Sequence, residues 1–116
     1  RKIFLISCAD NTDVDLKILK NIIPAQGNVS FGSPELLNDK LKVKPGSVSP
    51  YALINNLEKD VNFYIDKNIL NEKLCNFHPL LNTKTIQLET KDFIRFIREF
   101  TYLNVIDFDN YEIINL

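Results

Sequence analysis

The sequence predicts a single mixed α/β or α+β domain, and three observations lead to that class. The chain has 116 residues, which suits one domain and suffices for a buried core. Hydrophobic residues make up 45% of the chain and charged residues 25%, as in a globular domain rather than a disordered or membrane-spanning one. Strand-like and helix-like stretches alternate irregularly and without repeats, which favours a mixed sheet over a regular doubly wound one.

A strand and a helix are predicted for the first 24 residues. Residues 3–8 form a short apolar run, whose length favours a buried strand. Apolar residues then recur at three- and four-residue spacing from Val14 to Ile23, which predicts one amphipathic helix. Asp13 is expected to cap this helix, and Pro24 is expected to end it.

The start of a second helix is marked by three residues with separate physical roles. Ser33 can act as N-cap, Pro34 suits the first helical position, and Glu35 places negative charge in the first turn. A short strand at 29–31 is expected to lead into this helix. The apolar face of the helix consists of Leu36, Leu37 and Leu41.

A loop bracketed by two prolines, residues 44–50, comes next. Pro45 and Pro50 fix φ and lack an N–H donor, so the amides of residues 46–49 cannot all enter a regular ladder. Successive N–H groups of this kind can form a concave nest for an anion or a carbonyl oxygen, and Gly46 supplies the backbone freedom. Two interpretations remain open at this point, a ligand-binding loop and an ordinary turn.

A β-hairpin is predicted directly after the loop. Residues 51–54 are apolar and are expected to form its first strand, with Asn55 and Asn56 in the turn because asparagine tolerates left-handed φ. Side chains alternate between apolar and polar from Val61 to Asp66, which is typical of a return strand.

The rest of the chain is predicted to add two strands and two helical segments. Residues 66–73 are polar and are expected to hold a single helical turn. Strands are expected at 85–88 and 103–108, followed by an apolar-rich tail to Leu116 that pairs further or docks elsewhere. Thr90 is the expected cap of the last helix, whose wide apolar face is formed by Phe93, Ile94, Phe96, Ile97 and Phe100.

The balance of charge excludes a strong global attraction to nucleic acid. Lysine and arginine number 14 against 15 acidic residues, which gives a formal net charge of −1. Any nucleic acid must therefore be held locally, and the main basic cluster is Lys40, Lys42 and Lys44. This cluster is either a solvated surface or a local contact.

The two cysteines and the apolar runs indicate the cellular compartment in which the protein works. Cys8 and Cys75 lie far apart without metal-ligand spacing, so we expect free thiols that pack as small apolar side chains in a reducing compartment. The apolar start is too short for a signal-peptide core, and no run reaches the length of a bilayer span. We expect a cytoplasmic protein without a membrane partner.

His78, the only histidine, lies in a loop between Phe77 and Pro79. One histidine cannot form a metal site, so we expect neither a metal nor another cofactor. His78 is a candidate general base or hydrogen-bond donor, and a structural role is the alternative. Cys75 precedes it by three residues, but no third orienting residue supports a thiol hydrolase.

Three separated motifs together resemble the YbaK/ProX family of aminoacyl-tRNA deacylases. They are residues 29–37, the loop 45–55, and the pair 76–79 and 82–85, which occur in order at compatible spacing. The resemblance runs from about residue 1 to 108, and we expect residues 1–116 to form one editing domain. The histidine motif and the following Asn82-Thr83-Lys84-Thr85 look most like the prolyl-tRNA editing branch, which clears alanine from proline tRNA.

This resemblance implies a mixed, partly barrel-like sheet flanked by helices, and a site without a cofactor. The family's Gly-x-x-x-Pro loop maps to residues 46–50, whose backbone would hold the aminoacyl group and the terminal ribose of the tRNA. Gly46 and His78 are then the expected catalytic residues. The expected substrate-binding residues are Phe31, Ser47, Val48, Ser49, Pro50 and Asn82.

The implied partners are the aminoacylated acceptor end of tRNA and a prolyl-tRNA synthetase, in cis or in trans. A synthetase pocket for proline cannot strongly reject the smaller alanine, so a second site that admits alanine completes a double sieve. Two alternatives are a non-catalytic tRNA-binding or synthetase-association module of the same fold, and a deacylase for cysteine- or serine-charged tRNA.

The sequence also departs from the family pattern. The family's lysine on a strand upstream of residues 3–8 has no counterpart, since Lys2 does not match its position, and we expect this chain to lack the family's N-terminal segment. Ser49 keeps the hydroxyl of the usual threonine. Further departures are Tyr51, Ala52, Asn56 and Lys84, of which Ala52 and Lys84 bear on the choice of amino acid more than on the reaction.

Overall fold

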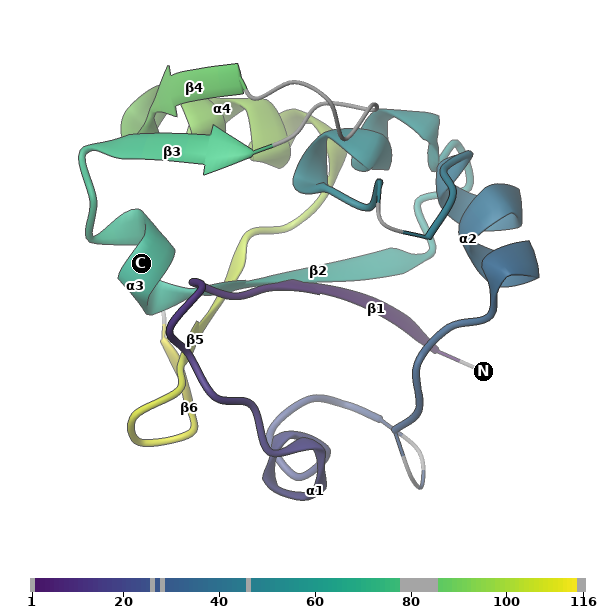
Figure 1. Cartoon of the computed structure of the whole chain (residues 1–116), viewed down its shortest axis with the longest axis horizontal. Coiled ribbons are helices and arrows are strands. Elements are labelled where there is room, and N and C mark those ends of the chain that lie inside the picture. The colour runs from purple at the N-terminus through teal and green to yellow at the C-terminus, as the bar shows by residue number, and fades with distance from the viewer. Residues whose placement is uncertain (1, 26, 28, 46, 78–85, 115–116) are drawn as a thin grey trace.

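A four-stranded mixed sheet forms the centre of the fold (Figure 1). The computed structural model describes residues 2–25, 27, 29–45, 47–77 and 86–114. The strand order is β1-β2-β5-β6, with β1 and β5 parallel to β2 and β6 antiparallel to β5. These strands span Ile3–Ser7 (β1), Val61–Asp66 (β2), Asn104–Asp107 (β5) and Glu112–Ile114 (β6).

A separate antiparallel pair and five helical segments complete the described structure. The pair joins β3 (Leu74–Phe77) to β4 (Ile86–Glu89). The helices are α1 (Leu16–Leu19), α2 (Pro34–Leu41), the 3-10 helix η1 (Pro50–Asn55), α3 (Lys67–Leu70) and α4 (Thr90–Phe100). Across the described ranges, every helix is too short or too polar to traverse a lipid bilayer.

Two hydrophobic cores lie on opposite faces of the sheet because the side chains of β2 alternate. Phe63 and Ile65 are fully buried in the larger core with Phe93 of α4, whereas Tyr64 joins the smaller core with Leu19 of α1. Figure 1 accordingly shows β3, β4 and α4 above the sheet and α1 below it. The predicted mixed α/β class and the alternation in β2 are confirmed.

The predicted hairpin is wrong, because residues 51–54 belong to η1 and β2 pairs in parallel with β1 and β5. Pro50 stands at the start of η1, where its fixed φ suits a helical turn. Pro50, Tyr51, Ala52 and Leu53 are all buried. A short apolar run buried on all sides has no helical or strand periodicity, so its pattern could not distinguish the two.

Three further predictions for the early chain and the sheet need correction. The helix predicted for 14–23 is limited to α1, and Asp15 caps it instead of Asp13, because the Asp15 carboxylate accepts from the amide of Lys17 at 2.9 Å. Residues 29–31 form no strand, and Phe31 is 88% exposed, so burial does not hold it in a sheet. Within the described residues the sheet is open, with β1 and β6 at its edges, and not barrel-like.

Other predicted elements are confirmed at their boundaries or nearly so. Ser33 caps α2 by accepting from the amide of Leu36 at 3.1 Å, and Pro34 follows at the first position. The single turn α3 falls inside the expected range 66–73, and the ends of β4 and β5 each lie one residue from the expected ranges. Helix α4 begins at Thr90, but the Thr90 hydroxyl donates to the carbonyl of Glu72 and the N-cap position is Glu89. The tail pairs further, as β6.

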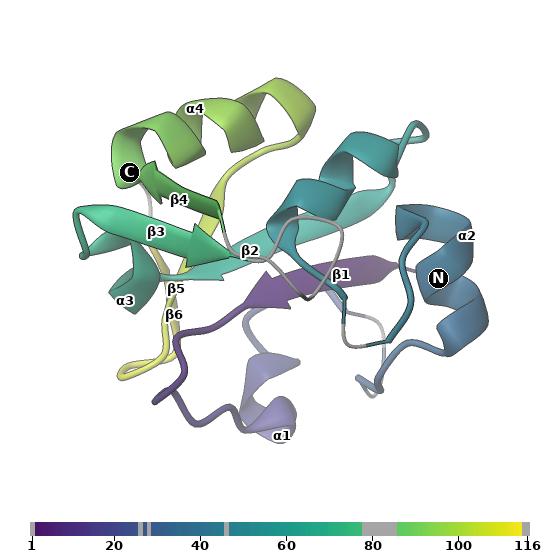
Figure 2. The same ribbon diagram turned by 45° about the horizontal axis from the view of Figure 1, so that its top comes forward.

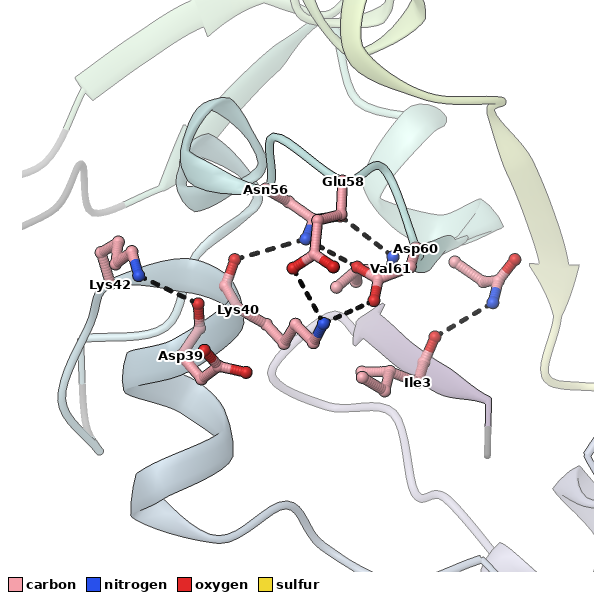
Figure 3. A network of polar contacts seen from close by, with 9 residues as sticks. Ile3, Asp39, Lys40, Lys42, Asn56, Glu58, Asp60 and Val61 are labelled. Atoms are coloured by element: carbon pink, nitrogen blue, oxygen red, sulfur yellow. Dashed lines mark hydrogen bonds and ion pairs between the residues drawn. The ribbon is translucent and has the colours of Figure 1, made fainter.

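The turn before β2 is fastened to α2 by one buried amide and one ion-pair cluster (Figure 3). Asn56 is 6% exposed; its Nδ2 donates to Asp60 Oδ1 at 2.9 Å, and its Oδ1 accepts from the amide of Val61 at 3.0 Å. Lys40 Nζ lies 2.6 Å from Asp60 Oδ2 and 3.1 Å from Glu58 Oε1. The bond with Lys40 lowers the pKa of Asp60, and the same contacts raise the pKa of Lys40.

We predict that Asn56→Ala lowers the free energy of unfolding by about 1–3 kcal/mol, because it leaves the buried Val61 amide without an acceptor. Urea unfolding at pH 7 measures this change. Asn21→Ala is the matched control, since Asn21 is exposed and its side chain makes one long hydrogen bond, of 3.4 Å, to the Lys17 carbonyl; it should alter stability by less than about 0.5 kcal/mol. Equal effects of the two substitutions would contradict the role given to Asn56.

Candidate active site

A cleft of about 900 Å³ lies beside the carboxyl ends of β1 and β2. Four segments line it: residues 6–11 at the end of β1, residues 48–50 of the proline loop, residues 68, 69, 71 and 72 in and after α3, and residues 74–77 of β3. Figure 1 shows β3 and the chain leading into η1 above β1, and in Figure 2 that chain passes in front of β1. Crevices at the carboxyl ends of parallel strands are a common place for ligands in α/β sheets.

The proline loop is held at both ends and presents Val48 to the cleft. The amide of Ser47 donates to the Lys44 carbonyl at 3.0 Å, and the amide of Ala52 donates to the Ser49 carbonyl at 3.0 Å. Ser49 and Pro50 are buried, whereas Val48 is 38% exposed. In the part of the chain that the structure describes, the Val48 amide has no hydrogen-bond acceptor. Among the described residues it is thus an unpaired donor on an anchored backbone.

Aromatic contacts fix the proline loop relative to β3. Tyr51, which follows Pro50, packs edge-on against both Phe77 and Phe93, with ring centroids 6.2 Å apart in each pair. Phe77 stacks on Phe93 at 4.9 Å and also lines the cleft. One aromatic cluster therefore positions two walls of the cleft.

The other two walls meet at Asp66, the last residue of β2, which is 0% exposed. Its Oδ2 accepts from the amide of Ala9 at 3.0 Å and from the hydroxyl of Thr12 at 2.5 Å. Its Oδ1 accepts from the amide of Asn68 at 2.9 Å and so caps α3. Asp66 is not among the site residues predicted from the sequence; the available signal was an Asp-x-Asn at a strand end, a helix-capping pattern.

The cysteines do not form a nucleophilic site. Burial, and secondarily the negative charge of Asp66, raise the pKa of the Cys8 thiol to about 11. Cys75 is 1% exposed, and its Sγ lies 3.2 Å from Thr90 Oγ1. Both thiols are free, as predicted. Within the described ranges, no group of three histidine, cysteine or acidic residues could hold a metal ion.

The structure brings together some of the predicted site residues and separates one. Val48, Ser49 and Pro50 line the cleft, and Ser47 lies in the turn just before them. Phe31 instead lines a second groove of about 1110 Å³, between β1 and α2. The other three predicted site residues, which are Gly46, His78 and Asn82, lie outside the described residues.

The fold and the cleft define a mixed α/β domain with a candidate ligand site at the carboxyl ends of parallel strands. The model of the family described as "Aminoacyl-tRNA editing domain" matches residues 1–96, so the chain belongs to that family. The predicted resemblance is thereby confirmed.

Relatives point to the same family. The "Prolyl-tRNA editing protein ProX" of Acetoanaerobium sticklandii is 29% identical over 98 residues, which are 84% of this chain and 59% of the relative. The "Prolyl-tRNA synthetase associated domain-containing protein 1" is 31% identical in Bos taurus (82% of this chain, 57% of the relative) and 28% identical in Danio rerio (91% and 58%). The chain therefore spans less than three fifths of the length of these relatives.

We predict that the raised pKa makes Cys8 a poor nucleophile. At pH 8, with a pKa of about 11, Cys8 should react with iodoacetamide at least about tenfold more slowly than a free cysteine, because little thiolate is present. The rate should climb above pH 10. Peptide mass spectrometry measures labelling, with protein unfolded in urea as the control. Labelling of folded protein at the free-cysteine rate at pH 8 would contradict this assignment.

Proposed function

We propose that this protein is an aminoacyl-tRNA deacylase that hydrolyses the ester of mischarged proline tRNA, with alanine as the amino acid. Membership of the editing family supports the reaction class. The name of the bacterial relative, a prolyl-tRNA editing protein, supports the choice of tRNA. The observation that carries the proposal is the anchored proline loop at the cleft, with the Val48 amide available as a donor.

The charge of the cleft supports entry by the aminoacyl end of the substrate. Its described lining includes the carboxylates of Asp10 and Glu72 but no lysine or arginine. An aminoacyl ester carries an ammonium group, which these carboxylates attract, whereas they repel phosphate. The phosphates of the tRNA would then remain outside the cleft, and binding would depend on salt.

The reaction requires little from the protein beyond positioning. An aminoacyl ester is already activated, so the site must place a water and stabilise the oxyanion that develops on the carbonyl. The Val48 amide is suited to donate to that oxygen, and a ribose hydroxyl of the substrate can assist the water. In this proposal Gly46 gives the loop its shape, while His78 lines the pocket and limits its size. The apolar side chains of Val48 and Phe77 would face the amino-acid side chain.

Two finer points belong to the same proposal. We propose that the acceptor end of tRNA is the macromolecular partner and that a prolyl-tRNA synthetase associates with the protein, which the names of the animal relatives support. We also propose that the protein acts in the cytoplasm, where its two free cysteines would stay reduced. A non-catalytic module of the same fold is the competing function, and activity separates the two.

We predict that the full-length protein hydrolyses alanyl-tRNA(Pro) faster than cysteinyl- or seryl-tRNA(Pro). Release of radiolabelled amino acid measures the rates. Hydrolysis of none of the three above the buffer rate would exclude a deacylase and favour the binding module. Preference for cysteine or serine would keep the reaction and change the substrate.

We further predict that Gly46→Ala and His78→Ala each lower the rate of alanyl-tRNA(Pro) hydrolysis at least about tenfold. In the proposal, Gly46→Ala distorts the proline loop and His78→Ala alters the pocket. The free energy of unfolding should change little. Leu57→Ala is the control, since Leu57 is 88% exposed and does not line the cleft. Loss of the folded state in both site variants would identify these residues as scaffold rather than site.

A further inference from the structure

Asp66 connects two walls of the cleft that are distant in sequence. Its bonds to Ala9 and Thr12 span 57 and 54 residues, whereas its bond to Asn68 is local. Loop 8–11 and the residues around α3 are two adjoining walls of the same cleft, which meet at this carboxylate. The carboxylate lies at the point where both segments leave the sheet.

Each carboxylate oxygen of Asp66 accepts hydrogen bonds from one wall of the cleft. Oδ2 receives both donors from the β1–α1 loop, and Oδ1 receives the donor from α3. Only a carboxylate offers acceptors on both sides, since an amide replaces one oxygen with a donor. The relative placement of the two walls therefore depends on both oxygens.

Asp107 offers a contrast within the same sheet. It ends β5, is 6% exposed, and accepts from the amides of Asp109 at 2.9 Å and Asn110 at 3.3 Å. These donors belong to the turn that immediately follows, and Lys67 adds one longer contact at 3.4 Å. Asp107 does not line the cleft or contact loop 8–11. A capping aspartate at a strand end can thus be structural only.

We propose that Asp66, acting through Thr12, is a positioning residue that sets the width of the cleft and with it the fit of the aminoacyl group. This inference rests on the proposed function, because it assigns the cleft to that group. The Thr12 hydroxyl holds the far end of the loop that carries Cys8, Ala9 and Asp10. Without this bond, the loop keeps one attachment to Asp66, through the Ala9 amide, and the end of the loop at Thr12 is held less firmly relative to α3.

A matched pair of variants tests the proposal. Thr12→Val removes the hydroxyl and keeps the shape of the side chain, whereas Thr12→Ser keeps the hydroxyl. In full-length protein, at a temperature where every variant is folded, Thr12→Val should raise KM for alanyl-tRNA(Pro) about fivefold or more with a smaller change in kcat. Thr12→Ser should have the wild-type KM and kcat, because it keeps the hydroxyl. Asp66→Asn should raise KM further, since the amide cannot serve both walls.

Asp107→Asn is the control for loss of stability without loss of positioning. It should lower the melting temperature and leave KM unchanged. If Thr12→Val and Asp66→Asn behave in the same way, with lower stability and wild-type KM, Asp66 is only a structural cap and the proposal is overturned.

A binding measurement separates failure of this inference from failure of the proposed function. If the wild type hydrolyses no aminoacyl-tRNA, the affinity for 3′-alanylamino-3′-deoxyadenosine, a non-hydrolysable mimic of the tRNA end, replaces KM. Thr12→Val should then weaken binding about fivefold, and Thr12→Ser should not. Equal affinity of the two variants would overturn the positioning role, as would a wild type that does not bind the mimic.

Discussion

Parallel pairing of β2 with both β1 and β5 is the constraint on which the rest of the structure depends. Parallel neighbours cannot be joined by a tight turn, so the chain must cross a face of the sheet between them. The long connection from β1 to β2 contains α1, α2, the proline loop and η1. This connection thereby places the proline loop at the carboxyl end of β1, where the cleft lies.

The elements that local chemistry specifies could be predicted from the sequence. Ser33 and Pro34 define a helix start without help from distant residues, and the alternation from Val61 to Asp66 identifies β2. The failure at residues 51–54 has a different cause. Whether that largely buried run becomes a strand or a 3-10 turn is decided by tertiary partners such as Phe77 and Phe93, which lie at least 23 residues further along the chain.

The same distinction applies to the site. The family motif identified residues 46–50 as site candidates, because a motif is recognised by the order and spacing of residues along the chain. Three of these residues line the cleft. A motif does not specify distances in space, and Phe31 accordingly lies in another groove. Asp66 could not be found from local patterns beyond its capping role, since two of its three donors come from residues more than 50 positions away.

The long separation between β1 and β2 also determines when the cleft can exist during folding. Loop closure over such a distance costs entropy before any contact rewards it, so pairings of this kind form late. Until β2 joins the sheet, β1 has no parallel neighbour and Ala9 has no carboxylate to meet. A nascent or partly folded chain consequently lacks two walls of the cleft. The complete cleft is therefore present only after β2 has joined the sheet.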